Sequence, residues 1–189
     1  MDKVGGEKLI TINSQDCKEK FYQSFKTQLE QINKTYDEIC IACIGTDRST
    51  GDSLGPLVGY KLGELEGIRI VGNLDKPLHA QNLKEFVSSL DENTLVIAVD
   101  AALGKEERVG FINVKQGALR PGAGVGKDLP HLGDIAITGI VNIGGMMEFM
   151  VLQNTRLSVV MKMADVISEG LKRVLKEKSS QGRQSQKSQ

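Results

Sequence analysis

The sequence predicts a three-layer α/β fold, in which a largely parallel sheet is covered by helices on both faces. Short apolar runs that are typical of buried strands alternate with segments whose apolar residues recur at helical spacing. This alternation implies parallel strands that are joined by crossover helices. The 189 residues are 40 % hydrophobic, enough for a substantial core. We therefore expect one domain over residues 1–178.

An amphipathic helix and a strand–loop–helix unit are predicted first. Apolar residues recur every three or four positions over 17–34, which predicts a helix laid on the domain. The apolar run 39–44 predicts a fully buried strand, and the polar segment 46–51 predicts a loop. One apolar helical face then extends over 54–65, where Pro56 in the first turn needs no N–H donor.

The alternation continues through the middle of the chain. Residues 68–71 and 95–99 predict strands, and an apolar helical face lies between them over 83–90. The run 109–114 predicts a further strand. Residues 117–133 are rich in Gly and Pro and predict a long ordered loop, and loops of this length are often functional.

The last part of the chain predicts one strand, two helices and a tail. The strand covers 135–143, and a long helix with a basic C-terminal end covers 157–178. Between them, the methionines around Glu148 predict a packed helix whose methionines lie in the core or on a partner surface. Residues 179–189 have no apolar side chain, which predicts a disordered polar tail.

Composition excludes several classes of partner. Lys plus Arg and Asp plus Glu both number 24, so no net charge attracts nucleic acid or an anionic membrane. No apolar stretch is long enough to span a membrane, and the polar start does not resemble a secretory signal, so we expect a cytoplasmic protein. Cys40 and Cys43 have redox-motif spacing, but residues three apart in a strand point to opposite faces, which favours buried, reduced thiols.

Asp52 and Asp100 are the leading candidate site residues. Each follows an apolar run at a point where the chain turns, and ligands collect at the carboxyl ends of parallel strands. The alternatives are a helix cap for Asp52 and a hydrogen-bonded strand-end carboxylate for Asp100. If both face one crevice, they share a proton and supply the acid and the base that amide hydrolysis by water requires. The other possibility is that both ionise and hold a cation, with an imidazole as third ligand.

Both histidines lie near the expected sheet edge. His131 is in the long loop before the last strand, and His79 opens a helix after the second strand. Histidine serves in catalysis and in metal binding, although a structural hydrogen bond is the alternative for each. Asp47 in the first loop and His79 are candidates for substrate binding. Backbone N–H groups for substrate or oxyanion contact are expected at Gly122, Gly124 and Gly126.

Two common enzyme motifs are absent from the sequence. A phosphate-binding P-loop ends in Gly-Lys-Ser/Thr, but Gly126 and Lys127 are followed by Asp128. The segment around Ser53 does not have the Gly-x-Ser-x-Gly spacing of a nucleophilic serine. Nucleotide hydrolysis and a serine triad are therefore not expected.

Three segments resemble, in the same order, parts of the germination endopeptidase that degrades small acid-soluble proteins in bacterial spores. They are Gly51-Asp52-Ser53-Leu54-Gly55-Pro56, Val99-Asp100-Ala101-Ala102 and Pro121-Gly122-Ala123-Gly124-Val125-Gly126. In that family the aspartates of the first two segments are the catalytic pair. The resemblance therefore implies that Asp52 and Asp100 are catalytic here and that the substrate is a protein or peptide.

A second resemblance overlaps the first. Gly45, the turn Asp52-Ser53-Leu54-Gly55, Asp100 and the segment Pro130-His131-Leu132-Gly133 look like hydrogenase maturation endopeptidases. There the two acidic positions and the histidine bind the nickel of the substrate protein. Both families share one α/β fold, so the domain is expected to be peptidase-like. The whole chain resembles most the YyaC family of candidate spore proteases from spore-forming bacteria, which implies a location in the forespore or spore core.

The combined expectation is a spore protease that hydrolyses peptide bonds with Asp52 and Asp100. His131 would orient the substrate, no cofactor would be needed, and small acid-soluble spore proteins would be the substrates. One alternative is a maturation-type endopeptidase in which Asp52, Asp100 and His131 bind a divalent metal. The other is a sporulation protein that kept the fold and binds partners without cleaving them.

Overall fold

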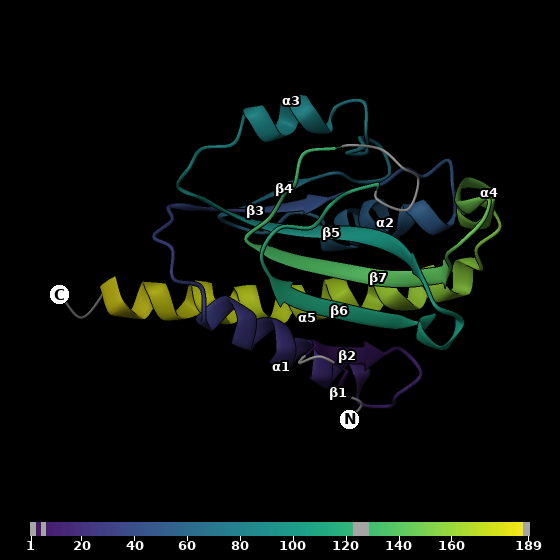
Figure 1. Ribbon diagram of the computed structural model, residues 1–189. Helices are drawn as coiled ribbons and strands as arrows, with labels where there is room; N and C mark the ends of the chain where they lie inside the picture. Colours follow the sequence, from purple (N-terminus) through teal and green to yellow (C-terminus); the bar gives the residue numbers. More distant parts are fainter. Residues whose placement is uncertain (1–2, 5–6, 123–128, 187–189) are drawn as a thin grey trace.

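The computed structural model describes residues 3–4, 7–122 and 129–186, and these residues form a seven-stranded mixed sheet with flanking helices (Figure 1). The strands are β1 (Lys3–Val4), β2 (Glu7–Thr11), β3 (Glu38–Cys43), β4 (Ile68–Val71), β5 (Thr94–Gly104), β6 (Phe111–Gln116) and β7 (Ile135–Ile143). The helices are α1 (Cys17–Glu30), α2 (Leu54–Leu62), α3 (Leu83–Ser88), α4 (Glu148–Gln153) and α5 (Leu157–Gln186), with 3-10 helices η1 (Gly51–Ser53) and η2 (Glu106–Arg108).

The sheet has a parallel part and an antiparallel part. Its strand order is β1-β2-β6-β7-β5-β3-β4. The four strands β4, β3, β5 and β7 are parallel neighbours, whereas β6 is antiparallel to β7, β2 to β6 and β1 to β2. β2 therefore has the direction of the four parallel strands, and only β6 and β1 oppose them. The predicted α/β fold with a largely parallel sheet is confirmed.

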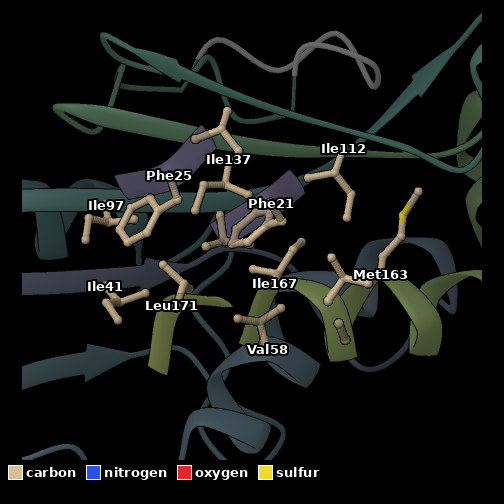
Figure 2. Packing of buried hydrophobic residues seen from close by; sticks show 14 of the residues in the cluster. Phe21, Phe25, Ile41, Val58, Ile97, Ile112, Ile137, Met163, Ile167 and Leu171 are labelled. Carbon is tan, nitrogen blue, oxygen red and sulfur yellow. The ribbon is translucent and has the colours of Figure 1, made fainter. Parts of the chain in front are cut away.

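Helices cover both faces of the sheet, but unequally. The large core cluster lies between one sheet face and α1, α2 and α5, and Figure 2 shows Phe21 and Phe25 among side chains from the sheet and from α5. The smaller cluster lies on the opposite face, where α3 contributes Leu83 and Phe86. In Figure 1, α3 lies on the opposite side of the sheet from α1 and α5. The three layers thus follow from apolar residues on both sides of the buried strands.

The two cysteines of β3 lie in different cores. Cys40 packs in the smaller cluster and Cys43 in the large one, as the alternation of a strand requires. Burial raises the pKa of the Cys40 thiol to about 11 and that of Cys43 further still. Both are free cysteines, which agrees with the predicted buried thiols.

Several elements differ from the sequence prediction. Strands β1 and β2 were not predicted, and α1 ends at Glu30 rather than near residue 34. The long helix was expected to end at residue 178, whereas α5 continues to Gln186. Hydroxyls of Ser179 and Ser180 donate to carbonyls one turn back, and adding residues to an existing helix costs little.

The core was one of the two environments expected for the methionines near α4, and the structure does not place them there. Met146 and Met147 are 87 % and 65 % exposed, and Met150 is exposed as well, so they do not lie in the core. None of the helices in the described ranges is both long and apolar enough to cross a membrane.

Candidate active site

The loop that follows β3 begins at Gly45, which lies close to the backbone of Asp52 in η1. Gly45 has a φ of +137°, and a Cβ there would lie 2.0 Å from the Asp52 carbonyl oxygen. A Cβ on Gly55 would lie 2.0 Å from the Ile44 carbonyl oxygen. The Thr46 N–H donates to the Asp52 carbonyl at 3.0 Å and closes the loop. Glycine at these two positions lets the chain bring Asp52 directly against the end of β3.

Asp52 lies in the short helix η1, one residue before the N-cap of α2. The N-cap residue is Ser53, and its hydroxyl donates to the Thr50 carbonyl at 2.7 Å. Ser53 occupies the N-cap position of α2 but makes no side-chain cap hydrogen bond there, so capping by Asp52 stays an alternative. The side chain of Asp52 is partly buried and lines the cavities described below.

Asp100 lies within β5, beside the end of β3. The last paired residues of β3 and β5 are Cys43 and Val99, so Asp100 is the first residue of β5 past the end of its neighbour. The strand does not end there, as the sequence suggested, but continues along β7 to Gly104. Asp100 is 7 % exposed, and its Oδ1 accepts a hydrogen bond from the Ala101 N–H at 2.8 Å.

The environment of Asp100 favours its neutral form. Burial raises the pKa of the Asp100 carboxyl well above its usual range, and the nearby charge of Asp52 raises it further. The hydrogen bond from Ala101 acts in the opposite direction but is the smallest of the three effects. Burial and the charge of Asp52 therefore both favour the protonated form of Asp100.

A first cavity of about 460 Å³ opens on one side of the pair. Its polar lining comprises Asp52, Asp100, Lys115, Arg120, His131 and Thr138. Thr138 of β7 lies directly opposite Asp100 in the parallel register, so their side chains share one sheet face. Lys115 reaches the same cavity from the antiparallel strand β6.

A second cavity of about 360 Å³ also borders the pair. Its lining includes Arg48, Ser49, Asp52, His79, Asp100 and Phe149. The two cavities share four lining residues, namely Asp52, Asp100, Gly122 and Leu152. The aspartate pair therefore lies at the junction of two open spaces rather than at the bottom of one closed pocket.

The predicted site residues fall into three groups. Asp52, Asp100 and Gly122 line both cavities, whereas His131 lines the first and His79 the second. Asp47 is exposed and lines neither of these cavities. Gly124 and Gly126 lie outside the described residues, so their expected contacts stay predictions.

Other lining residues were not singled out from the sequence. Arg48 and Ser49 belong to the loop already suspected, and their position between two aspartates was the available signal. Arg120 lies in the long loop 117–133 that was expected to be functional. Lys115 and Thr138 gave no signal, because their approach depends on the antiparallel pairing of β6 and on the register of β7.

The described residues do not fit a resident metal centre. Asp52, Asp100 and His131 line one cavity, but no group of three His, Cys, Asp or Glu side chains in the described part of the chain could hold a metal ion. A carboxyl group whose pKa is raised beside a second carboxyl group, as for Asp100 beside Asp52, is an arrangement used in acid–base chemistry.

The chain is similar to a known sequence, to a solved structure and to a family model. It is 55 % identical over 138 residues to the uncharacterized protein YyaC of Bacillus subtilis (strain 168), a match that covers 70 % of this chain and 67 % of that protein. Among solved structures, it is similar to the NiFe hydrogenase maturation protease HycI of Thermococcus kodakarensis KOD1. That similarity has a TM-score of 0.48 and 18 % identity, and covers 78 % of this chain and 98 % of HycI. A family model matches residues 10–170, and the chain belongs to that family, which is described as protein of unknown function (DUF1256).

Proposed function

We propose that this protein is an endopeptidase that hydrolyses peptide bonds with water activated by Asp52 and Asp100. The observation that carries the proposal is the coupled pair at the junction of two open cavities. A polypeptide that crosses this junction would have chain on both sides of the bond to be cleaved. The motif resemblance to the germination endopeptidase also supports this function, and extends it to a spore protease.

In the proposed reaction, ionised Asp52 takes a proton from the attacking water, and neutral Asp100 donates its proton to the carbonyl oxygen of the peptide. The water oxygen bonds to the carbonyl carbon and forms a neutral tetrahedral intermediate. The proton on Asp52 then passes to the nitrogen while the C–N bond breaks, and one hydroxyl of the intermediate returns its proton to Asp100 as the new carboxylic acid forms. Such proton transfers each contribute about 10²–10⁴-fold to a rate.

The charges around the pair support a substrate with acidic segments. Lys115 and Arg120 line the first cavity and Arg48 lines the second, so cationic groups flank the aspartates on both sides. Such groups attract carboxylates of an unfolded chain, and more so at low salt. Small acid-soluble spore proteins, which the motif resemblance to the germination endopeptidase implies, are the proposed substrates.

The test is to incubate the protein with a protein extract of Bacillus subtilis spores and to map new peptide termini by mass spectrometry. We expect new termini with the wild-type protein and a loss of about 10²–10⁴-fold in their rate of formation with Asp52→Asn and Asp100→Asn. Asp75→Asn, an exposed change on another loop, is the matched control and should cleave normally. Normal cleavage by Asp52→Asn would refute the catalytic assignment.

A second function, binding without cleavage, is favoured by one observation. Met146, Met147 and Phe149 are mostly exposed near α4, and Phe149 also lines the second cavity. Exposed apolar clusters of this kind mark interaction sites. A stable, uncleaved partner retained by the purified wild-type protein, together with the absence of new termini, would select this function.

A further inference from the structure

Exposed apolar side chains gather around α4. The described residues outside 143–157 contain only one large apolar side chain that is exposed, Tyr60 of α2. Four neighbouring residues, which we call the α4 surface, have exposed fractions between 48 % and 87 %, and they are Met146, Met147, Phe149 and Met150. Soluble proteins rarely expose several large apolar side chains together without a binding role, so this surface calls for a partner.

The α4 surface is held in place by the fold. The Gly144 N–H donates to the Gly104 carbonyl at 2.7 Å, which ties the turn before α4 to the end of β5. α4 itself packs on η1, where a Cβ on Gly51 would lie 2.8 Å from Leu152 Cδ2. The apolar side chains are therefore exposed on a fixed support, which lowers the entropic cost of binding a ligand.

Met147 adds an unfavourable backbone conformation to this surface. Its φ of 55° and ψ of 39° are left-handed, and no other non-glycine residue in the described ranges has a positive φ. Bulky residues rarely adopt this conformation, and positions of this kind concentrate at functional sites. The strain at Met147 is thus a second observation that favours a binding role for the turn before α4.

The α4 surface continues into the proposed active site. Phe149 belongs to both, because it lines the second cavity together with Asp52 and Asp100. Leu152, on the same helix, lines both cavities. A polypeptide that lies across the aspartate pair and leaves the second cavity past Phe149 therefore meets the α4 surface. The six residues of α4 span about 9 Å, the length of about three residues of extended chain.

The chemistry of the α4 surface fits an apolar ligand. Glu148 is the only charged residue over 143–155, and its Oε1 accepts a hydrogen bond from the Gly145 N–H at 3.2 Å. An acidic segment would find no cationic side chain in this stretch, whereas apolar side chains would be removed from water together with the methionines. Methionine side chains are flexible and adapt to ligands of different shape, so more than one apolar sequence fits.

We propose that the α4 surface binds an apolar segment of the substrate polypeptide, beyond the second cavity and outside the residues at the cleaved bond. The inference rests on the proposed endopeptidase function and adds a requirement to its substrate. An acidic chain would be cleaved efficiently only where an apolar segment lies within reach of α4. Binding energy from this remote segment would hold the peptide bond at the aspartate pair.

The first test measures binding without any need for cleavage. The probes are a fluorescent Gly-Ser peptide with leucines at alternate positions and the same peptide without leucines. Wild-type protein should bind the leucine peptide more tightly, and Met146→Ser combined with Met150→Ser should weaken this binding about tenfold, because apolar contact is lost. Tyr60→Ser, at a site that is 61 % exposed on α2, is the matched control and should bind as the wild type does. Equal affinity for both peptides, or no loss in the double variant, would overturn the inference.

The second test measures kinetics with synthetic peptides that span one cleavage site mapped in the spore extract. Apolar residues are replaced by serine on one side of the bond or on the other. One of these replacements should raise the KM of the wild-type protein about tenfold. Met146 and Met150 line neither cavity, so their double variant should have a raised KM for the parent peptide and respond little to the same replacement. If the two changes raise KM independently of each other, the peptide does not contact the α4 surface.

A second copy of the chain is the competing occupant of this surface. Analytical ultracentrifugation separates the two, because a wild-type dimer that the double variant converts to a monomer would overturn the inference in favour of self-association. Failure of the proposed function is seen separately. If wild-type protein produces no new termini, hydrolysis is refuted. Leucine-dependent binding that is lost in the double variant would then still support an apolar polypeptide as the ligand, and its absence would overturn this ligand too.

Discussion

The protonation of Asp100 links the candidate site to the stability of the protein. Because burial and the charge of Asp52 raise the pKa of Asp100, the folded state resists ionisation of a group that the unfolded chain ionises freely. The folded protein is therefore relatively most stable below the ordinary carboxyl pKa, and loses this contribution as the pH rises toward the raised pKa. At neutral pH, where a hydrolase would act, the raised pKa of Asp100 thus lowers the free energy of unfolding.

Asp100→Asn removes the ionisable group and keeps an oxygen that can accept from the Ala101 N–H. At pH 7 we expect a larger free energy of unfolding than in the wild-type protein. The difference should shrink toward zero as the pH falls below about 4, where the unfolded wild-type chain also becomes protonated at this position. Urea titrations across this pH range provide the measurement.

The exposed variant Asp75→Asn serves as control and should show no comparable pH-dependent gain. A constant difference between Asp100→Asn and wild type at all pH values would mean that the carboxyl has an ordinary pKa.

For single residues, the sequence predicted that Asp52 and Asp100 lie near each other, but it did not predict why the pKa of Asp100 is raised. Apolar runs before Asp52 and Asp100 were sufficient to place both near the ends of neighbouring parallel strands. The burial of Asp100 depends on the continuation of β5 along β7, which no local pattern around residue 100 indicates.

Among the elements, the contact of α2 with the end of β3 most directly sets the position of Asp52. A Cβ at residue 55 would overlap backbone atoms of Ile44, including its carbonyl oxygen at 2.0 Å and its nitrogen at 2.6 Å. Neither backbone group can move without disturbing the hydrogen bond from the Ile44 N–H to the Val99 carbonyl. Glycine is therefore required by close approach at this position.

Gly55→Ala should lower the free energy of unfolding by about 3 kcal/mol or more, as severe backbone overlap in a core does. Gly63→Ala is the matched control, because Gly63 has a φ of +61° but no atom within 4 Å of an added Cβ. Only backbone strain then applies, because φ +61° with ψ −138° is a conformation that non-glycine residues rarely adopt, and this strain costs about 1–3 kcal/mol. Chemical denaturation compares the two variants, and equal losses would contradict the close contact.

The antiparallel strand β6 shows the limit of prediction at the element scale. Its apolar run was recognised as a strand, but the run alone specifies neither its direction nor its neighbours. β6 is inserted between β7 and the N-terminal strand β2, which a simple alternation of strands and helices does not anticipate. The approach of Lys115 to the first cavity was therefore not predictable.

Across the whole molecule, stability rests mainly on the larger of the two cores. Phe21 of α1 is fully buried, stacks on Phe25 with ring centroids 6.2 Å apart, and fits against Gly170 of α5. Its position joins two helices and the sheet face shown in Figure 2. The smaller core under α3 contains fewer large side chains, among them Phe86.

Phe21→Ala should therefore lower the free energy of unfolding by about 3–5 kcal/mol, because the tightly packed helices cannot close the cavity it leaves. Phe149→Ala, at a site that is 64 % exposed, should change it by less than about 0.5 kcal/mol. Guanidinium chloride unfolding of both variants provides the comparison. A small effect of Phe21→Ala would show that α1 does not anchor the core.

The fold class was predictable because apolar runs and apolar residues at helical spacing alternate along this chain, and this alternation is typical of a sheet covered by helices. Buried parallel strands require apolar side chains on both faces, and this requirement is visible in the runs that became β3 and β5. The unequal thickness of the two helical layers was not predictable, since it depends on which crossover helix takes which face.

The pairing of β2 with β6 also determines when the sheet can be completed during synthesis. Leu9, Ile10 and Thr11 are joined to partners between residues 111 and 113, so β2 leaves the ribosome long before its partner β6 is synthesised. Until then the edge of β2 that pairs with β6 stays unpaired. Closing the long chain segment between the two strands is also slow. A nascent chain that stalls before residue 111 would expose the unpaired edge of β2. We therefore expect chaperones to bind the chain at that stage, as a consequence of this topology.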